Sequence, residues 1–235
     1  MNKSDFPKHI GIIMDGNGRW AKKFFMRREA GHRAGAQALR RLVQNMDAVG
    51  FEALTVYAFS TENWKRDEDE VAYLMGLITE YIQKYIDDVK KSNGRIRIIG
   101  DRAALTPTLR EKIAHLEELT KDKTGILLNI AINYGGRDEI VRVAKKIAMD
   151  AVESKISIDD IDEELFISYL DTSPLPDPEL IIRTSGEMRL SNFMLWQAAY
   201  SEFYATPILW PDFKIKHVYE AIEAYSIRQR RFGGR

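Results

Sequence analysis

The chain has 235 residues, which is enough for one large α/β domain or two small ones. Lys and Arg together number 35, as do Asp and Glu, and a net charge of zero argues against a general nucleic-acid-binding protein, which carries a basic excess. Cysteine is absent, which excludes disulfides, thiolate metal sites and cysteine nucleophiles.

No apolar run approaches the length of a membrane-spanning helix, and residues 1–8 lack the apolar core of a signal peptide. We therefore expect a cytoplasmic protein without a transmembrane segment. No internal repeat, linker or low-complexity stretch divides the sequence, so we predict a single domain over residues 1–235.

The first predicted strand, Ile10 to Met14, is too short for a helix and too apolar for an exposed strand, which indicates a strand buried in a parallel sheet. Asp15 follows at its carboxyl end, where such sheets bind ligands. Gly16 and Gly18 permit a tight turn, and Arg19 offers a forked cation to phosphate oxygens. Because a carboxylate repels phosphate, we expect Mg²⁺ between them. The alternative, a plain turn without chemistry, is less favoured.

Strands and helices alternate along the rest of the chain. Further strands are predicted over residues 53–59, 95–100, 125–133, 179–183 and 200–206. Helices are predicted over residues 33–49, 71–89, 106–119, 140–148 and 218–230, and a short acidic helix is predicted within residues 156–170. This alternation predicts an α/β fold with a central, mainly parallel, six-stranded sheet flanked by helices. The apolar triplet Phe24-Phe25-Met26 lies among cations, and we interpret it as a flap over a ligand.

Residues 71–89 carry an apolar stripe at helical spacing over five turns. The stripe predicts packing against the core, and part of it could also line an elongated apolar cavity. Periodicity does not separate these two interpretations.

Polar clusters follow two more strands, as expected where parallel strands end at a ligand site. Residues 60–66 form the first cluster. In the second, Arg183, Arg189 and Ser191 provide two guanidinium groups and a hydroxyl, which suit a diphosphate better than a charged surface turn. Glu202 lies among aromatic residues, where a carboxylate needs a cation or a salt bridge, and we interpret it as sharing a metal with Asp15.

These segments carry a family resemblance that covers nearly the whole chain. The matching blocks are residues 9–20, 31–35, 57–66, 129–140, 182–197 and 200–213. They resemble the cis-prenyltransferases, and among these the bacterial undecaprenyl diphosphate synthases. The resemblance implies a Mg²⁺-dependent homodimer with an apolar tunnel. It also implies extension of farnesyl diphosphate by isopentenyl diphosphate to a long product such as undecaprenyl diphosphate, the lipid carrier precursor for cell-wall synthesis, which could draw the enzyme to a membrane surface.

The resemblance also assigns roles to individual residues. Asp15 matches the essential Mg²⁺-linked aspartate, Glu202 the second Mg²⁺ carboxylate, and Asn63 a position linked to proton removal. The positions that match the allylic diphosphate site are Gly16, Asn17, Gly18, Arg19, Arg28, His32 and Arg66. Other substrate contacts match Trp20, Ser60, Thr61, Glu62 and Trp64. The isopentenyl diphosphate site matches Arg183, Arg189, Leu190 and Ser191. His32 alone, apart from the resemblance, is equally compatible with a structural role.

Some positions depart from the family pattern. The Phe24-Phe25-Met26 segment is bulkier than usual, Asp67 replaces a common proline, and Met188 replaces a histidine proposed to contact metal. Arg231-Phe232-Gly233 resembles an ending that reaches the isopentenyl diphosphate of a neighbouring subunit.

Two other functions fit the sequence less well. A non-catalytic partner subunit would lack the turn at Asp15 to Arg19, which this chain keeps. A Mg²⁺-dependent phosphatase or kinase on a Rossmann-like sheet would need a second nearby acid or a nucleotide loop, and the sequence shows neither.

Overall fold

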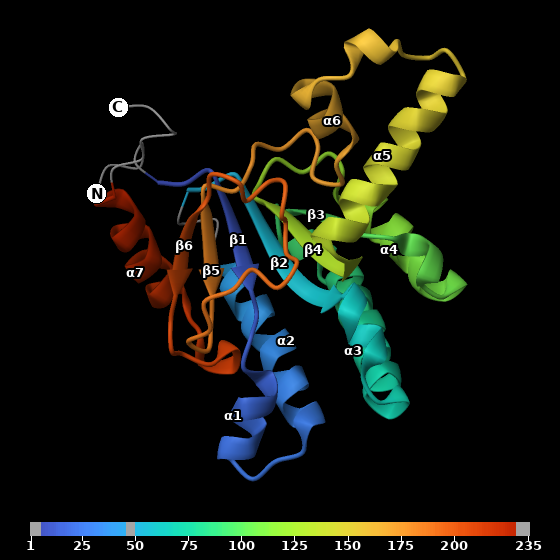
Figure 1. Cartoon of the computed structure of the whole chain (residues 1–235). Coiled ribbons are helices and arrows are strands. Elements are labelled where there is room, and N and C mark those ends of the chain that lie inside the picture. Colours follow the sequence, from blue (N-terminus) through green and yellow to red (C-terminus); the bar gives the residue numbers. More distant parts are fainter. Residues whose placement is uncertain (1–5, 46–49, 229–235) are drawn as a thin grey trace.

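A six-stranded parallel sheet forms the centre of the molecule (Figure 1). The computed structural model describes residues 6–45 and 50–228. The strands are β1 (His9–Ile13), β2 (Ala53–Ser60), β3 (Arg95–Ile99), β4 (Leu127–Tyr134), β5 (Leu180–Arg183) and β6 (Glu202–Ala205). Their order is β3-β4-β2-β1-β5-β6, with every neighbouring pair parallel, which confirms the predicted fold class.

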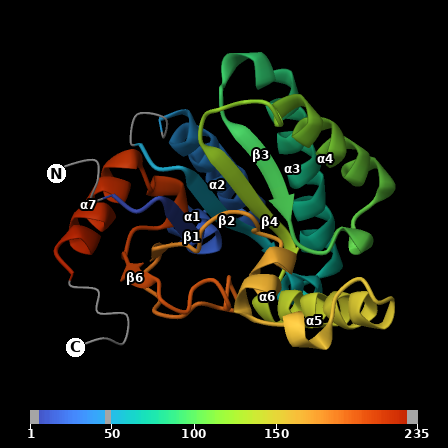
Figure 2. The same cartoon turned by 90° about the horizontal axis from the view of Figure 1, so that it is seen from above.

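Helices cover both faces of this sheet. They are α1 (Asn17–Lys23), α2 (Arg28–Gln44), α3 (Glu68–Asp87), α4 (Pro107–Thr120), α5 (Gly136–Val152), α6 (Glu163–Tyr169) and α7 (Ile215–Ser226). Helices α2, α3, α4 and α7 pack into one hydrophobic core, and α5 and α6 lie on the opposite side (Figure 2). This two-sided cover explains why the inner strands β1, β2, β4 and β5 are mainly apolar and buried.

Strand β1 contributes side chains to two hydrophobic cores, one on each face of the sheet. All five of its residues are buried, with Ile10 and Ile12 in the core under α2 and α7 and Ile13 in the smaller core on the other face. Because successive side chains of a strand point to opposite faces, a strand at the centre of a covered sheet is mainly apolar on both faces. His9 is the polar exception in β1, and its Nε2 lies 2.7 Å from Thr55 Oγ1.

The structure differs from the predictions near the first turn. Residues 21–29 divide between the end of α1, a short turn and the start of α2, which begins at Arg28 rather than at residue 33. Phe25 is fully exposed in that turn with a φ of 56°. Within the described residues, Phe24, Phe25 and Met26 line none of the cavities described below, so the structure gives no support for a closed flap.

The later segments follow the predictions more closely. Residues 156–170 contain one short helix, as predicted: α6 covers Glu163–Tyr169, after a short 3₁₀ turn at Ile158–Asp160. The ending at Arg231-Phe232-Gly233 lies outside the described residues. Among the helices in the described part of the chain, none has the length and apolar character needed to cross a bilayer.

Two leucines of α4 provide a direct test of this packing. Leu116 is fully buried and Leu119 is 40% exposed on the same helix. Leu116→Ala removes core contacts and leaves a cavity, so it should lower the free energy of unfolding by about 2–5 kcal/mol. Leu119→Ala is the matched control and should lower it by about 0.5 kcal/mol or less. Urea denaturation measures both, and equal losses would contradict the assigned burial.

Candidate active site

Segments that follow β1, β2 and β5 meet at the carboxyl edge of the sheet. They surround a cavity of about 620 Å³. Its lining includes the polar residues Asp15, Asn17, His32, Ser60, Glu62, Asn63, Arg66, Arg183, Arg189, Ser191 and Asn192. The structure thus brings together predicted residues from both ends of the chain, because strands β1, β2 and β5 are neighbours in the sheet.

The turn after β1 is fixed against the segment after β5. Asp15 N–H donates to the hydroxyl oxygen of Thr184 at 2.9 Å, and that hydroxyl donates to Asp15 O at 2.6 Å. Gly16 adopts a φ of 108°, and a Cβ there would lie 3.2 Å from the Cα of Leu209. The turn therefore needs glycine both for its left-handed backbone and for close packing.

Asp15 is the electrostatic centre of this edge. Its carboxylate accepts a hydrogen bond from Arg183 Nη2 at 2.9 Å and lies 3.2 Å from Arg19 Nη2. Partial burial acts to raise the pKa of Asp15, but hydrogen bonds from Arg183 and Ser185 and the two guanidinium charges outweigh it and lower the pKa. Asp15 is therefore a stable carboxylate at neutral pH.

The loop after β5 arranges the second group of basic residues. Arg183 is only 4% exposed, and its Nη1 donates to Ser191 Oγ at 2.7 Å and to the Arg189 carbonyl. Arg189 pairs with Glu187 at 2.7 Å. Leu190 packs with the smaller core.

The backbone of this loop is held in an uncommon conformation. Four non-glycine residues with positive φ lie within ten positions: Ser185, Ser191, Asn192 and Met194. Such backbone costs on the order of 1–3 kcal/mol per residue and collects at functional sites. The cost is consistent with a loop shaped for ligand contact rather than for stability.

The segment after β2 forms a 3₁₀ helix, η2 (Thr61–Lys65). Asn63 Oδ1 accepts a hydrogen bond from Ser60 N–H at 3.0 Å, which closes a capping box. Glu62 accepts from Asn192 Nδ2, and Trp64 donates to Asn133 Oδ1, both at 2.7 Å. Asn192 is a cavity residue that the sequence analysis missed, although it directly follows Ser191.

A third cluster lies where α2 meets the start of α3. Arg66 and Arg28 pair with the Glu70 carboxylate at 2.7 and 2.9 Å, and His32 Nε2 lies 3.4 Å from it. Burial is the main cause that lowers the pKa of His32, and the charge of Glu70 opposes it. Glu70 was not among the predicted site residues, although it follows Arg66 by only four positions.

Several predicted residues do not line the cavity. Trp20 donates to Asp212 at 2.9 Å, and Thr61 packs against Gly135, where a Cβ would lie 2.6 Å from Thr61 Oγ1. Arg19 is held beside the cavity by Asp15 and by the Ser185 carbonyl, to which it donates at 3.1 Å. Gly18 faces Arg28, and a Cβ on Gly18 would lie 3.3 Å from Arg28 Nε.

Glu202 and Asp15 lie apart within one chain. Glu202 begins β6 and pairs in register with Leu180, whereas Arg183, the contact of Asp15, lies three residues further along β5. At about 3.3 Å per residue this places Glu202 about 10 Å further toward the amino edge. Its carboxylate pairs with Arg228 at 2.6 Å, so one chain does not bring Glu202 and Asp15 to the same metal. The salt-bridge alternative fits the geometry.

The Asp15 carboxylate and the Asn17 amide oxygen are the candidate ligands for a metal in this cavity. Among the described residues, no group of three or more His, Asp or Glu side chains is placed to hold an ion. Asp15 and Asn17 both line the cavity, and Asn17 Oδ1 is buried without a hydrogen-bond partner. One carboxylate and one amide oxygen beside a diphosphate fit Mg²⁺, which keeps few protein ligands and binds substrate phosphates.

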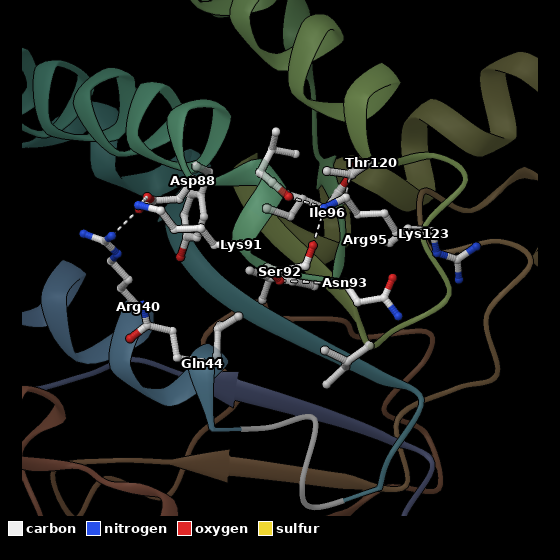
Figure 3. Close-up of a pocket in the computed structure, with 16 residues that line it drawn as sticks. Arg40, Gln44, Asp88, Lys91, Ser92, Asn93, Arg95, Ile96, Thr120 and Lys123 are labelled. Carbon is white, nitrogen blue, oxygen red and sulfur yellow. Dashed lines mark hydrogen bonds and ion pairs between the residues drawn. The ribbon is translucent and has the colours of Figure 1, made fainter.

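Two further cavities follow the same face of the sheet. An apolar cavity of about 100 Å³ shares Met14, His32 and Leu74 with the first, and runs between α2 and α3 to Tyr85. Tyr85 also lines a cavity of about 370 Å³ at the amino ends of β3 and β4, together with Ile126 (Figure 3). The apolar stripe of α3 therefore fits both interpretations, because it packs into the core and also lines a cavity.

Comparisons with known proteins identify the family of the chain. The family model described as "Putative undecaprenyl diphosphate synthase" matches residues 13–233. An isoprenyl transferase of Clostridium perfringens is 53% identical over 97% of this chain and 90% of its own length. One of Bacillus subtilis is 51% identical over 99% and 89%.

Solved structures show the same fold. Lavandulyl diphosphate synthase from Lavandula x intermedia, in complex with dimethylallyl diphosphate, superposes with a TM-score of 0.94 at 35% identity, covering 98% of this chain and 99% of that one. A probable undecaprenyl diphosphate synthase from Campylobacter jejuni gives a TM-score of 0.80 at 34% identity, covering 97% and 98%. The chain therefore belongs to the undecaprenyl diphosphate synthase family and is a cis-prenyltransferase.

Proposed function

We propose that this cis-prenyltransferase condenses isopentenyl diphosphate onto farnesyl diphosphate and repeats the step to make a long polyprenyl diphosphate such as undecaprenyl diphosphate. The observation that carries the proposal is one cavity with two arginine-bearing walls, continued along the same face of the sheet by an apolar cavity and then by a cavity with a mixed polar and apolar lining. Two walls suit two diphosphates, and the apolar path suits a growing hydrocarbon chain.

In this proposal the allylic diphosphate lies beside the turn that follows β1. Arg66 and His32 line that side of the cavity, and Arg19 and Arg28 flank it. Charge-assisted hydrogen bonds from guanidinium groups stabilise the negative charge that develops on the leaving diphosphate. Asp15 holds the carboxylate charge that a divalent cation would need here.

Isopentenyl diphosphate lies in this proposal against Arg183, Arg189 and Ser191. Arg183 is already oriented by Asp15 and Ser191, so little side-chain freedom is lost on binding. Holding C1 of the allylic substrate near the double bond of the second substrate removes much of the entropic barrier to the condensation.

Asp15 and Asn17 are the residues that would hold Mg²⁺ with a substrate diphosphate. When bound, the ion neutralises diphosphate charge as a Lewis acid. Asn63 is an amide without useful basicity near neutral pH, and its Oδ1 is engaged by Ser60 N–H. We propose that Asn63 positions substrate, and that a phosphate oxygen or water takes the proton. The homodimer implied by the resemblance is also part of this proposal.

Incubation with Mg²⁺, farnesyl diphosphate and labelled isopentenyl diphosphate tests the proposal, with chromatographic sizing of the lipid product. We expect long polyprenyl diphosphates and no turnover after chelation of the metal. Release of inorganic phosphate without chain growth would favour a phosphatase, and a folded protein that forms no product would overturn the proposal.

The first prediction concerns Asp15. Asp15→Ala removes the charge that orients Arg183 and that the proposed cation needs, and turnover should fall at least about 100-fold. The turnover of the isosteric variant Asp15→Asn should fall by a comparable factor, because this variant keeps the shape of the side chain but not its charge. Circular dichroism checks that the variants are folded, and folded Asp15→Asn with near-normal turnover would refute the assignment.

The second prediction separates the two diphosphate sites. Arg189→Ala and Arg183→Ala should weaken use of isopentenyl diphosphate more than binding of farnesyl diphosphate. Each lost charge-assisted contact should cost about 1.5–3 kcal/mol. Arg110→Ala, at an exposed arginine of α4, is the control. Equal weakening of both ligands in direct binding measurements would contradict the two-site assignment.

The third prediction concerns the far cavity. Ile126 is 7% exposed and lines the cavity of about 370 Å³. Ile126→Ala enlarges that space and should shift products toward longer chains, while Ile158→Ala, at a side chain that is 77% exposed, should leave them unchanged. An unaltered distribution from an active Ile126→Ala enzyme would count against a limiting role for this residue.

A further inference from the structure

Glu70 lies in the first turn of α3, and its position there looks ordinary. The first turn also contains Glu68 and Asp69, and acidic residues at a helix start are explained by the helix dipole. Its surroundings are not ordinary, because the Glu70 side chain is only 12% exposed. A carboxylate this far from water requires compensating partners.

Those partners come from two segments that are separate in the sequence. Arg66, just after η2, donates to Glu70 Oε1 at 2.7 Å, and Arg28, the first residue of α2, contacts Oε2 at 2.9 Å. His32, one turn further along α2, presents a buried Nε2 that has no hydrogen-bond partner and lies 3.4 Å from Oε1. One carboxylate therefore gathers three of the four basic residues assigned to the allylic diphosphate.

The geometry leaves those basic groups available to a ligand. A guanidinium group has five N–H donors, and each arginine uses one nitrogen on Glu70. Arg28 is 58% exposed and Arg66 is 32% exposed, so their other donors reach solvent or the cavity. Without Glu70 the two like charges would repel each other, and two long side chains would regain their rotamers.

We propose that Glu70 is a positioning residue for the allylic substrate: it is a fixed counter-ion that holds Arg28, His32 and Arg66 together before the diphosphate arrives. The inference rests on the proposed function, since it takes the allylic diphosphate as the ligand. Preorganised donors bind more tightly because their ordering does not have to accompany binding. A carboxylate that merely repelled the diphosphate would have the opposite effect.

The test compares variants by direct calorimetric binding of farnesyl diphosphate. Glu70→Gln keeps the shape but not the charge and should raise the Kd about 10-fold, equivalent to about 1.4 kcal/mol. Glu70→Asp keeps the charge on a shorter side chain and should lie between Glu70→Gln and the wild type. Glu80→Gln is the matched control, because Glu80 pairs with Arg33 and Lys84 further along α3, outside the site.

Two readouts separate positioning from a loss of structure. The KM for isopentenyl diphosphate should stay unchanged in Glu70→Gln, since that substrate is assigned to the other wall. Arg28→Met should also weaken farnesyl diphosphate binding, and the double variant should lose less than the sum of the two single losses. If Glu70→Gln does not fold, Glu70→Asp is tested instead. It should bind farnesyl diphosphate more weakly than the wild type and keep an unchanged KM for isopentenyl diphosphate.

Several outcomes would overturn the inference. They are farnesyl diphosphate binding to Glu70→Gln that equals or exceeds that of the wild type, equal weakening of both substrates, and strict additivity with Arg28→Met. Chain elongation by the wild type is measured in parallel. Failure of that elongation would count against the proposed function, whereas unchanged binding by the Glu70 variants would count against this inference alone.

Discussion

The buried ion pair between Arg183 and Asp15 is the interaction on which the rest of the site depends. Arg183 ends β5 and is 4% exposed, so its charge requires a partner within reach. Asp15, directly after the neighbouring strand β1, supplies one at 2.9 Å. The pair ties the first turn of the chain to a loop 168 residues later, and Thr184 reinforces the tie by hydrogen bonds to Asp15. The two proposed diphosphate positions lie on opposite sides of this pair.

Ion pairs also orient other arginines around Asp15 and Arg183. Arg189 is held by Glu187, and Arg66 by Glu70, each at 2.7 Å. The basic side chains are therefore oriented before any ligand binds, and they keep free donors for one. A diphosphate entering such a site meets arranged hydrogen-bond donors at little further cost in side-chain order. This arrangement also shows how a chain with zero net charge can present strongly basic walls.

Much of the fold was predictable from the sequence, because strands at the centre of a covered parallel sheet are mainly apolar on both faces. Asp15 and Arg183 were found by the same reasoning, since each lies where such a run ends. The ion pair of Glu202 with Arg228 was not predicted, because Arg228 lies just after α7 and pairing between distant segments is not visible in spacing. Glu70 was missed because an acidic residue at a helix start has an ordinary explanation, and only the folded chain shows its burial.

We propose that two diphosphates bind to these arranged arginines while the hydrocarbon of the allylic substrate follows the apolar face between α2 and α3. The most direct measurement is a crystal structure with a thiolo analogue of farnesyl diphosphate and isopentenyl diphosphate bound together. The account predicts one diphosphate against Arg28 and Arg66, the other against Arg183 and Arg189, and the farnesyl tail directed toward Tyr85. A tail on the opposite face of the sheet, or both diphosphates on one arginine group, would contradict it.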